Sequence, residues 1–200
     1  MAATRPRTTT PEGREQRDRI LRAALELFTA HGFRGASLDA VAAAVGISRQ
    51  GVLHYFPSKT HLLLGVLDLR DELSAARAEE RARAGNWDLA EGLLDVVSHN
   101  QREPDLTRLF TVLAAEGVAP EHPGHERFQE RYRHVRTVLT QAAREAQESG
   151  RFRADIDPAI VATLLAAVMD GLQLQFLLDP EAVDMVEPLA QLLKLLGGEQ

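Results

Sequence analysis

The sequence predicts an all-α protein of about nine helices, and both its composition and its apolar spacing support that fold class. Alanine and leucine are abundant, whereas aromatic residues make up only 5% of the 200 residues, and this balance favours helices over strands. Apolar residues recur three and four positions apart through most of the chain, which is the period of an amphipathic helix. Apolar residues amount to 44% and charged residues to 26%, as in ordinary globular proteins.

The sequence lacks the features of disulfide-bonded, secreted and membrane-spanning proteins. There is no cysteine, so neither disulfides nor thiolate metal sites are available. The N-terminal residues contain no apolar stretch of the kind found in signal peptides. The most apolar run is interrupted by Asp170 and Gln173, which leaves it too short to span a bilayer. We therefore expect a cytoplasmic protein with no membrane partner.

The beginning of the chain predicts a short tail followed by a long helix. Residues 1–10 are polar and include two arginines among threonines and prolines, so we expect them to be disordered. Thr10 is a suitable N-cap, Pro11 a suitable first helical residue, and Gly32 a suitable end for this helix. The apolar residues of this helix form one buried stripe: Ile20, Leu21, Ala24, Leu25, Leu27 and Phe28.

Residues 37–59, which read SLDAVAAAVGISRQGVLHYFPSK, predict two short helices joined by a tight turn. Ser37 is expected to cap a helix that runs from Leu38 to about Val45. Gly46 supplies the left-handed conformation that ends it, and Ser48 caps the next helix. Two short helices around a glycine turn indicate a helix-turn-helix, whose second helix lies in the DNA major groove.

The outer face of the second short helix carries side chains suited to reading DNA. Val52 and Phe56 are four residues apart on the inner face, which leaves residues 49–51 and 53–55 wholly or partly outward. Among the outward residues, an arginine can pair with guanine, a glutamine with adenine, and a histidine or tyrosine can reach bases or phosphates. Ser37 and the free amides near it suit a phosphate, and Lys59 is expected near the DNA backbone.

Charge is distributed in a way that supports DNA binding. Residues 1–60 carry a formal charge of +4 and residues 61–200 carry −10, which together give the net charge of −6. A basic end that carries a helix-turn-helix on an acidic protein is typical of DNA-binding proteins. Arg14, Arg17 and Arg19 of the first helix either contact phosphates or form a solvated face.

The helix-turn-helix resembles that of tetracycline-repressor-like (TetR family) transcriptional regulators. The family pattern has a Thr or Ser cap, small residues, a G-V-S turn and Y-x-x-F-x-[SN]-K-x-x-L. The matching residues are Ser37, Ala42, Gly46, Ile47, Ser48, Phe56, Ser58, Lys59 and Leu62 or Leu63. Leu53 replaces the usual tyrosine, and His54 or Tyr55 can substitute for its phosphate contact. The resemblance implies DNA contacts from Ser37, Ser48, Arg49, Gln50, Gly51, His54, Tyr55 and Lys59.

The remaining residues predict a helical body for ligand binding and dimerisation. We therefore divide the chain into three parts: a tail at residues 1–10, a helix-turn-helix domain at residues 11–59, and this body at residues 60–200. The predicted helices of the body cover approximately residues 59–84, 87–101, 104–117, 126–149, 158–178 and 180–196.

Several residues on the body helices, polar ones among them, are candidates for a ligand pocket, although each polar residue taken alone is more typical of the protein surface. The predicted pocket residues are His99, Asn100, Arg102, Phe110 and Leu113. His122 and His125 in the loop of residues 119–128 suggest a metal site, but the chain offers no cysteine or third ligand there. We therefore favour a solvated loop and expect neither a metal nor a cofactor.

The last two helices predict a dimer. Residues 159–178 are apolar nearly all round, so this helix must be covered on both sides. In the resembled family two such helices pair with their symmetry mates as a four-helix interface. A core formed entirely within one chain is the alternative. The predicted interface residues are Leu164, Ala167, Val168, Gly171, Leu189, Leu192, Leu193 and Leu196.

The functional expectation is a homodimeric regulator that binds a palindromic DNA operator. The resemblance further implies repression that a small-molecule effector releases. A helical ligand-binding or scaffold protein that has lost DNA binding is the second candidate, supported by Leu53 and by the modest basic charge. An enzyme is disfavoured, because the sequence contains no phosphate loop, nucleophile elbow or plausible catalytic triad.

Overall fold

The computed structural model describes residues 10–83 and 88–197, and within them the chain is helical, as predicted. The chain divides into two compact units, Met1–Arg77 and Ala78–Gln200. The predicted tail before Thr10 and the predicted helix start at Trp87 lie outside the described residues.

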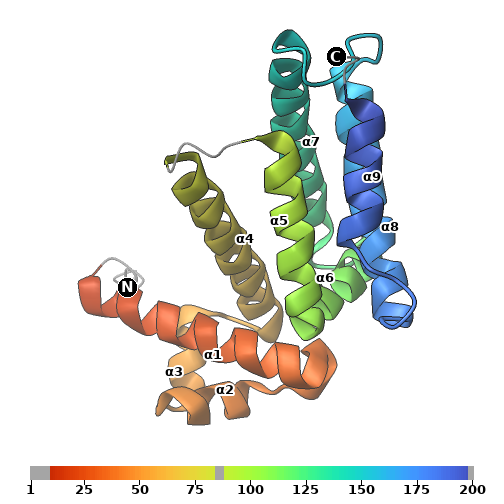
Figure 1. Cartoon of the computed structure of the whole chain (residues 1–200). Helices are drawn as coiled ribbons and strands as arrows, with labels where there is room; N and C mark the ends of the chain where they lie inside the picture. Colours follow the sequence, from red (N-terminus) through yellow and green to blue (C-terminus); the bar gives the residue numbers. More distant parts are fainter. Residues whose placement is uncertain (1–9, 84–87, 198–200) are drawn as a thin grey trace. The chain divides into compact units, whose positions relative to one another are not determined.

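The first unit contains α1 (Pro11–Gly35), α2 (Leu38–Val45), α3 (Arg49–Tyr55) and the first part of α4 (Lys59–Arg83) (Figure 1). Its core contains four residues of the stripe predicted on the first helix, together with Val41, Val52 and residues of α4: Ile20, Leu21, Ala24, Phe28, Leu62, Leu63 and Leu67. The other two residues of the predicted stripe, Leu25 and Leu27, are only half-buried. Gly65 of α4 lies so close to the first helix that an added Cβ would be 2.8 Å from Leu21 Cδ2. The absence of a side chain at Gly65 therefore permits the close packing of α4 in this unit.

The predicted boundaries of α1 are confirmed at its start and refined at its end. Thr10 Oγ1 accepts a hydrogen bond from the Gly13 amide at 3.1 Å, and Pro11 is the first helical residue. Gly32 has a φ of +70° and breaks the helix, after which one further turn continues to Gly35. The glycine therefore marks the break that the sequence predicts, because only glycine adopts this conformation without steric cost.

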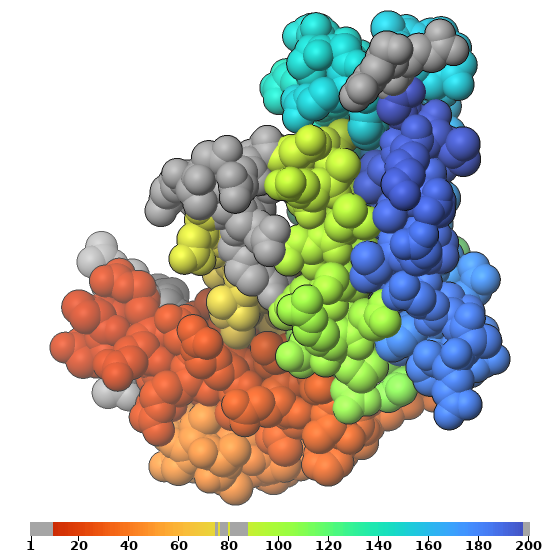
Figure 2. Space-filling view, in the orientation of Figure 1, coloured from red at the N-terminus to blue at the C-terminus, as the bar shows by residue number. Residues whose placement is uncertain are grey.

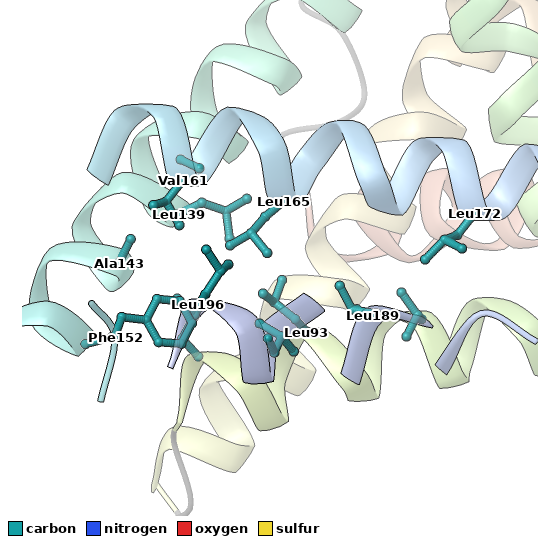
Figure 3. Close-up of a cluster of buried hydrophobic side chains, with 14 of the residues drawn as sticks. Leu93, Leu139, Ala143, Phe152, Val161, Leu165, Leu172, Leu189 and Leu196 are labelled. Carbon is teal, nitrogen blue, oxygen red and sulfur yellow. The ribbon is translucent and has the colours of Figure 1, made fainter. Parts of the chain in front are cut away.

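The second unit contains α5 (Leu89–Arg102), α6 (Pro104–Glu116), α7 (His125–Glu148), α8 (Pro158–Leu178) and α9 (Val186–Leu196). α7 packs along α8, and α5 packs against α9. Figure 2 shows the green surface of α5 beside the dark-blue surface of α9. Side chains from these helices meet in one apolar cluster (Figure 3). In that view Val161, Leu165 and Leu172 of α8 face Leu93 and Leu189 across the cluster.

The predicted start of the last helix is wrong: the sequence suggests a start near residue 180, whereas α9 begins at Val186. Aspartate side chains hold the preceding backbone in a turn, since Asp179 accepts from the Ala182 amide and Asp184 from the Val186 amide. Gln101 Oε1 of α5 also accepts from the Met185 amide at 3.1 Å. These local and long-range hydrogen bonds compete with helix formation, although the apolar spacing continues through the turn.

Among the described residues, α8 is the one helix that is long and apolar enough, by length and composition alone, to cross a membrane, with a mean hydropathy of 1.7. This differs from the expectation that Asp170 and Gln173 leave the apolar run too short, because both residues lie within one continuous helix. Core helices of globular proteins have the same composition, and one face of α8 lies in the apolar cluster of the second unit. The opposite face is open in the single chain. Its exposed apolar residues are Ile160 at 54%, Leu164 at 48%, Leu174 at 51% and Leu178 at 77%.

A polar contact joins α7 to α8. The hydroxyl of Tyr132 donates to Asp170 Oδ2 at 2.7 Å. Desolvation, reinforced by the neighbouring carboxylate, raises the pKa of Tyr132 well above its usual value. Desolvation also raises the pKa of Asp170, while the hydrogen bond from Tyr132 and the charge of Arg131 oppose that rise. Asp170 is therefore a partly desolvated carboxylate that depends on Tyr132 for its hydrogen bond.

The substitution Tyr132→Phe is expected to lower the free energy of unfolding by about 1 kcal/mol at pH 7, a modest value because Asp170 remains accessible to solvent. The lost hydrogen bond stabilises the ionised carboxylate, so its removal raises the pKa of Asp170 further. The loss is therefore present above the pKa of Asp170 and shrinks as the pH falls through it. Urea denaturation over a pH series measures this effect.

Tyr55→Phe, at the other tyrosine of the chain, is the matched control. If the stability lost in Tyr132→Phe does not change with pH, the loss does not come from the hydrogen bond to ionised Asp170, and the explanation is wrong.

Candidate nucleic-acid interface

Hydrogen bonds at the helix ends define the geometry of the α2–α3 pair. Ser37 Oγ accepts from the Ala40 amide at 3.1 Å, and Ser48 Oγ accepts from the Gly51 amide at 3.1 Å. Gly46 has a φ of +71°, and the amides after Val45 return to the last carbonyls of α2. The three predicted end signals are thus confirmed, and they produce a helix-turn-helix.

The structure separates an inner from an outer face on α3, as the sequence predicts. Val52 is fully buried in the first unit, and Phe56, which follows the helix, is buried as well. Ser48, Arg49, Gln50 and His54 are exposed, whereas Gly51, Leu53 and Tyr55 are half-buried. The outer face therefore presents one guanidinium, one amide and one imidazole, the groups that hydrogen-bond to base edges and phosphates.

Gly51 also has a packing role that the sequence does not reveal. A Cβ added at Gly51 would lie 3.3 Å from Ile47 Cδ1, which is closer than most real contacts of a Cβ atom. The glycine therefore lets the side chain of Ile47 fold back against the first turn of α3. Close packing against Ile47 is therefore a structural role of Gly51 within the first unit.

The exposed side chains of α3 have only weak partners within the protein. Arg49 Nε lies 3.9 Å from Asp39 Oδ2 of α2, and both side chains are well exposed. The rings of His54 and Tyr55 meet edge to face with centroids 5.5 Å apart. An exposed ion pair contributes little to stability, so Arg49 can exchange Asp39 for another hydrogen-bond partner at low cost.

Lys59 is placed by contacts with the end of α1. Its ammonium donates to the carbonyl of Arg34 at 3.3 Å and lies 4.6 Å from the centre of the Phe33 ring. The preceding Ser58 accepts from the His61 amide at 3.2 Å and so caps α4. Lys59, the first residue of α4, is therefore held with its ammonium beside the loop that leads to Ser37. The Ser58 cap is recognisable in the sequence from its position before a helix.

The predicted pocket residues are divided between the interior and the surface of the second unit. Asn100 is only 5% exposed, Phe110 and Leu113 are buried, and His99 is half-buried. Arg102 differs from the expectation, because its side chain is exposed and donates to Ser98 Oγ at 2.7 Å. The buried residues of α5 are Leu89, Leu93, Val97 and Asn100, spaced three and four apart, and Arg102 falls outside this stripe.

The two loop histidines have structural partners. His125 Nδ1 lies 2.8 Å from the carbonyl of Gly117, and His122 Nδ1 accepts from the Gly124 amide at 3.1 Å. The described part of the chain contains no group of three or more metal-ligating side chains. These histidines connect the end of α6 to the start of α7.

The predicted interface residues fall into two sets. Leu164 and Ala167 are exposed and Gly171 is half-buried, while Val168 and Leu192 are half-buried and pack against the apolar cluster of the second unit. Leu189, Leu193 and Leu196 instead lie in the apolar cluster of the second unit, where the chain's own helices cover them. The structure differs from the predicted interface at these three leucines, because α9 directs them toward α5 and α8. Sequence periodicity identifies an apolar face but does not specify which neighbour covers it.

Comparisons with known proteins match both parts of the chain. The model of bacterial regulatory proteins of the tetR family matches residues 20–66, and that of the C-terminal region of BetI-type transcriptional repressors matches residues 86–197. The HTH-type transcriptional repressor AcnR of Corynebacterium diphtheriae is 29% identical over 160 residues, 78% of each chain.

Solved structures of regulators have the same fold. A putative transcriptional regulator from Saccharomonospora viridis in complex with choline is 25% identical with a TM-score of 0.72, over 90% of this chain and 94% of that one. Thermus thermophilus FadR in complex with lauroyl-CoA is 26% identical with a TM-score of 0.66, over 90% of this chain and 92% of that one.

The substitution Gly46→Ala is expected to lower the free energy of unfolding by about 1 to 2 kcal/mol, because a Cβ is strained in the left-handed conformation. Nothing lies within 4 Å of the added Cβ, so the backbone alone causes the loss. Urea denaturation measures it. Gly46→Asn serves as the control and should lose less, because asparagine tolerates this conformation; equal losses would argue against the backbone explanation.

Proposed function

Because this chain belongs to the tetR family of bacterial transcriptional regulators, we propose that it binds a palindromic operator as a homodimer and represses transcription until a small molecule releases it. The observation that carries the DNA-binding proposal is the capped α2–turn–α3 unit with its exposed outer face. The chain is not an enzyme, because the members of its family are transcriptional regulators. The cytoplasm, where its DNA would be, is the proposed location.

The proposed division of labour at the operator follows from position and chemistry. Arg49 and Gln50 stand at the start of α3 and are exposed, which suits hydrogen bonds to base edges. Ser37, Ser48 and Lys59 lie at helix N-termini, where backbone amides and a cation favour phosphates. His54 and Tyr55 take the place of the tyrosine that the family usually has at Leu53.

Dimerisation is proposed through the open face of α8. Exposed apolar residues lie on one side of this helix, Leu164 among them, and the small residues Ala167 and Gly171 allow a second helix to approach closely. A second copy of the chain would cover this face by a two-fold axis. Two-fold symmetry then places two α3 helices on two half-sites of a palindrome.

The effector is proposed to bind in the second unit. Its only buried polar side chains among the described residues are Asn100 and Thr107, and the Thr107 hydroxyl donates to the carbonyl of Asn100 at 2.8 Å. Asn100, Phe110 and Leu113 of the predicted pocket are all buried, and one amide among apolar side chains would suit an effector that is largely apolar. Two structural relatives bind choline and lauroyl-CoA, which supports a small-molecule effector for this chain.

Release requires that the effector distinguish two states of the protein. An effector that binds the operator-competent and operator-incompetent states equally well changes nothing, however tightly it binds. Repression would end because the effector shifts the population toward the state in which the two α3 helices no longer match the half-sites.

The double variant Arg49→Ala, His54→Ala is expected to bind an operator, selected by the wild-type protein from random duplexes, about 10- to 100-fold more weakly. The reason is the loss of two exposed side chains of α3 that can contact bases or phosphates. Gel shifts at several salt concentrations measure this change, and wild-type affinity should fall steeply with salt.

The double variant Arg22→Ala, His31→Ala removes the same residue types from exposed positions on α1 and should leave affinity within about twofold of wild type. Unchanged operator affinity in the Arg49 and His54 variant would favour a ligand-binding protein without a DNA-reading role. Selection of no sequence, or binding insensitive to salt, would refute the proposed function.

The substitution Leu164→Arg is expected to convert the wild-type dimer to a monomer, because it places a charge in the apolar α8 face. Sedimentation measures the oligomeric state. Val112→Arg on α6 is the matched control, since Val112 is 50% exposed and Leu164 48%. A monomeric wild type, or a dimer that persists with Leu164→Arg, would contradict the proposed interface.

A further inference from the structure

Arg19 of α1 reaches across to the end of α2. Its Nη2 donates to the carbonyl of Val45 at 3.1 Å, and its Nη1 donates to Gln16 Oε1 at 3.1 Å. Val45 is the last residue of α2 and directly precedes Gly46 of the turn. A side chain of the first helix therefore contacts the helix-turn-helix at the point where the chain changes direction.

This contact supplies a hydrogen bond that α2 cannot form for itself. The last carbonyls of a helix have no partner within the helix, and they carry a partial negative charge. The Gly46 amide returns to the carbonyl of Ala43, and the Ile47 amide to that of Ala42. Arg19 provides a charged donor to the carbonyl of Val45, so a cation stabilises the C-terminus of α2.

A second arginine of α1 contacts the other end of α3. The guanidinium of Arg17 lies 5.3 Å from the centre of the Phe56 ring, and Phe56 directly follows Tyr55, the last residue of α3. Arg17 and Arg19 thus connect one helix to both sides of the reading helix: the turn before it and the residue after it. The seven residues of α3 are too few to hold a helix without such external contacts.

We propose that Arg19 is a positioning residue for DNA reading, which fixes the turn before α3 by its hydrogen bond to Val45 and makes no contact with the DNA. This inference rests on the proposed function, because it concerns how well α3 fits an operator. A guanidinium that already donates to Val45 and Gln16 is oriented toward the protein. A phosphate contact by Arg19 is the competing explanation for any loss of affinity.

The salt dependence of binding distinguishes these two roles. A side chain that neutralises a phosphate releases a counterion, so its removal lowers the slope of log affinity against log salt concentration by about 1. Removing a positioning residue leaves the slope unchanged, because the number of phosphate contacts stays the same, and weakens operator binding at every salt concentration.

The test measures the affinity of wild type, Arg19→Ala, Arg19→Lys and Arg22→Ala for the selected operator by fluorescence anisotropy over a series of potassium chloride concentrations. Arg22 is exposed on the same helix, so Arg22→Ala removes the same charge as a matched control. We expect Arg19→Ala to weaken binding about 3- to 10-fold with an unchanged slope. Arg19→Lys should recover part of the affinity, since its ammonium can still donate to Val45.

Amide hydrogen exchange in the free protein provides a readout that needs no DNA. Exchange at Gly46 and Ile47 should accelerate in Arg19→Ala and remain at the wild-type rate in Arg22→Ala, because Arg19 holds the carbonyl of the residue before them. Stoichiometric titration with operator gives the active fraction of each variant and so separates positioning from a failure to fold.

Three outcomes overturn the inference: a slope lowered by about 1, which indicates a phosphate contact; an Arg19→Ala affinity equal to wild type; or exchange at Gly46 and Ile47 that does not change. If wild type selects no operator while exchange in Arg19→Ala still accelerates, the proposed function fails and the role of Arg19 in fixing the turn remains.

Discussion

The helix-turn-helix depends on satisfying the backbone groups at the ends of two very short helices. α2 has eight residues and α3 has seven, so a large share of their amides and carbonyls have no partner within the helix. Helices of this length do not persist alone in water. Ser37, Gly46 and Ser48 satisfy the local part of this requirement, and Arg19 supplies a contact from α1.

The local part of this requirement could be predicted from the sequence, and the long-range part could not. Caps depend on residue type and on a spacing of two or three residues, so Ser37, Gly46 and Ser48 could be identified without a structure. The bond from Arg19 to Val45 joins residues 26 positions apart. Nothing in the local pattern of α1 distinguishes Arg19 from its exposed neighbours, and only the packing of α1 against α2 brings the two groups together.

The second unit shows the same limit in its apolar residues. Periodicity predicted correctly that α8 and α9 carry apolar faces, but a helix pattern does not say which face the same chain covers. Leu189, Leu193 and Leu196 pack inward, whereas Leu164 remains exposed. The start of α9 was missed for a related reason, because Gln101 of α5 holds the Met185 amide from a distance in sequence. The exposed face of α3 in the candidate DNA site could be predicted, because the spacing of Val52 and Phe56 identifies the opposite, inner face.

The proposed function relates the open apolar face of α8 to the exposed face of α3. On the proposed function, a single α3 would offer few base contacts, and specific affinity would rise steeply when two such helices bind together. An exposed apolar face on α8 favours association, because burial of such surface from water is favourable by about 25 cal/mol per Å². The apolar face of α8 would thus supply the second reading helix that α3 needs. The rigidity of each turn then matters twice, since an error in the placement of α3 would be repeated in both half-sites.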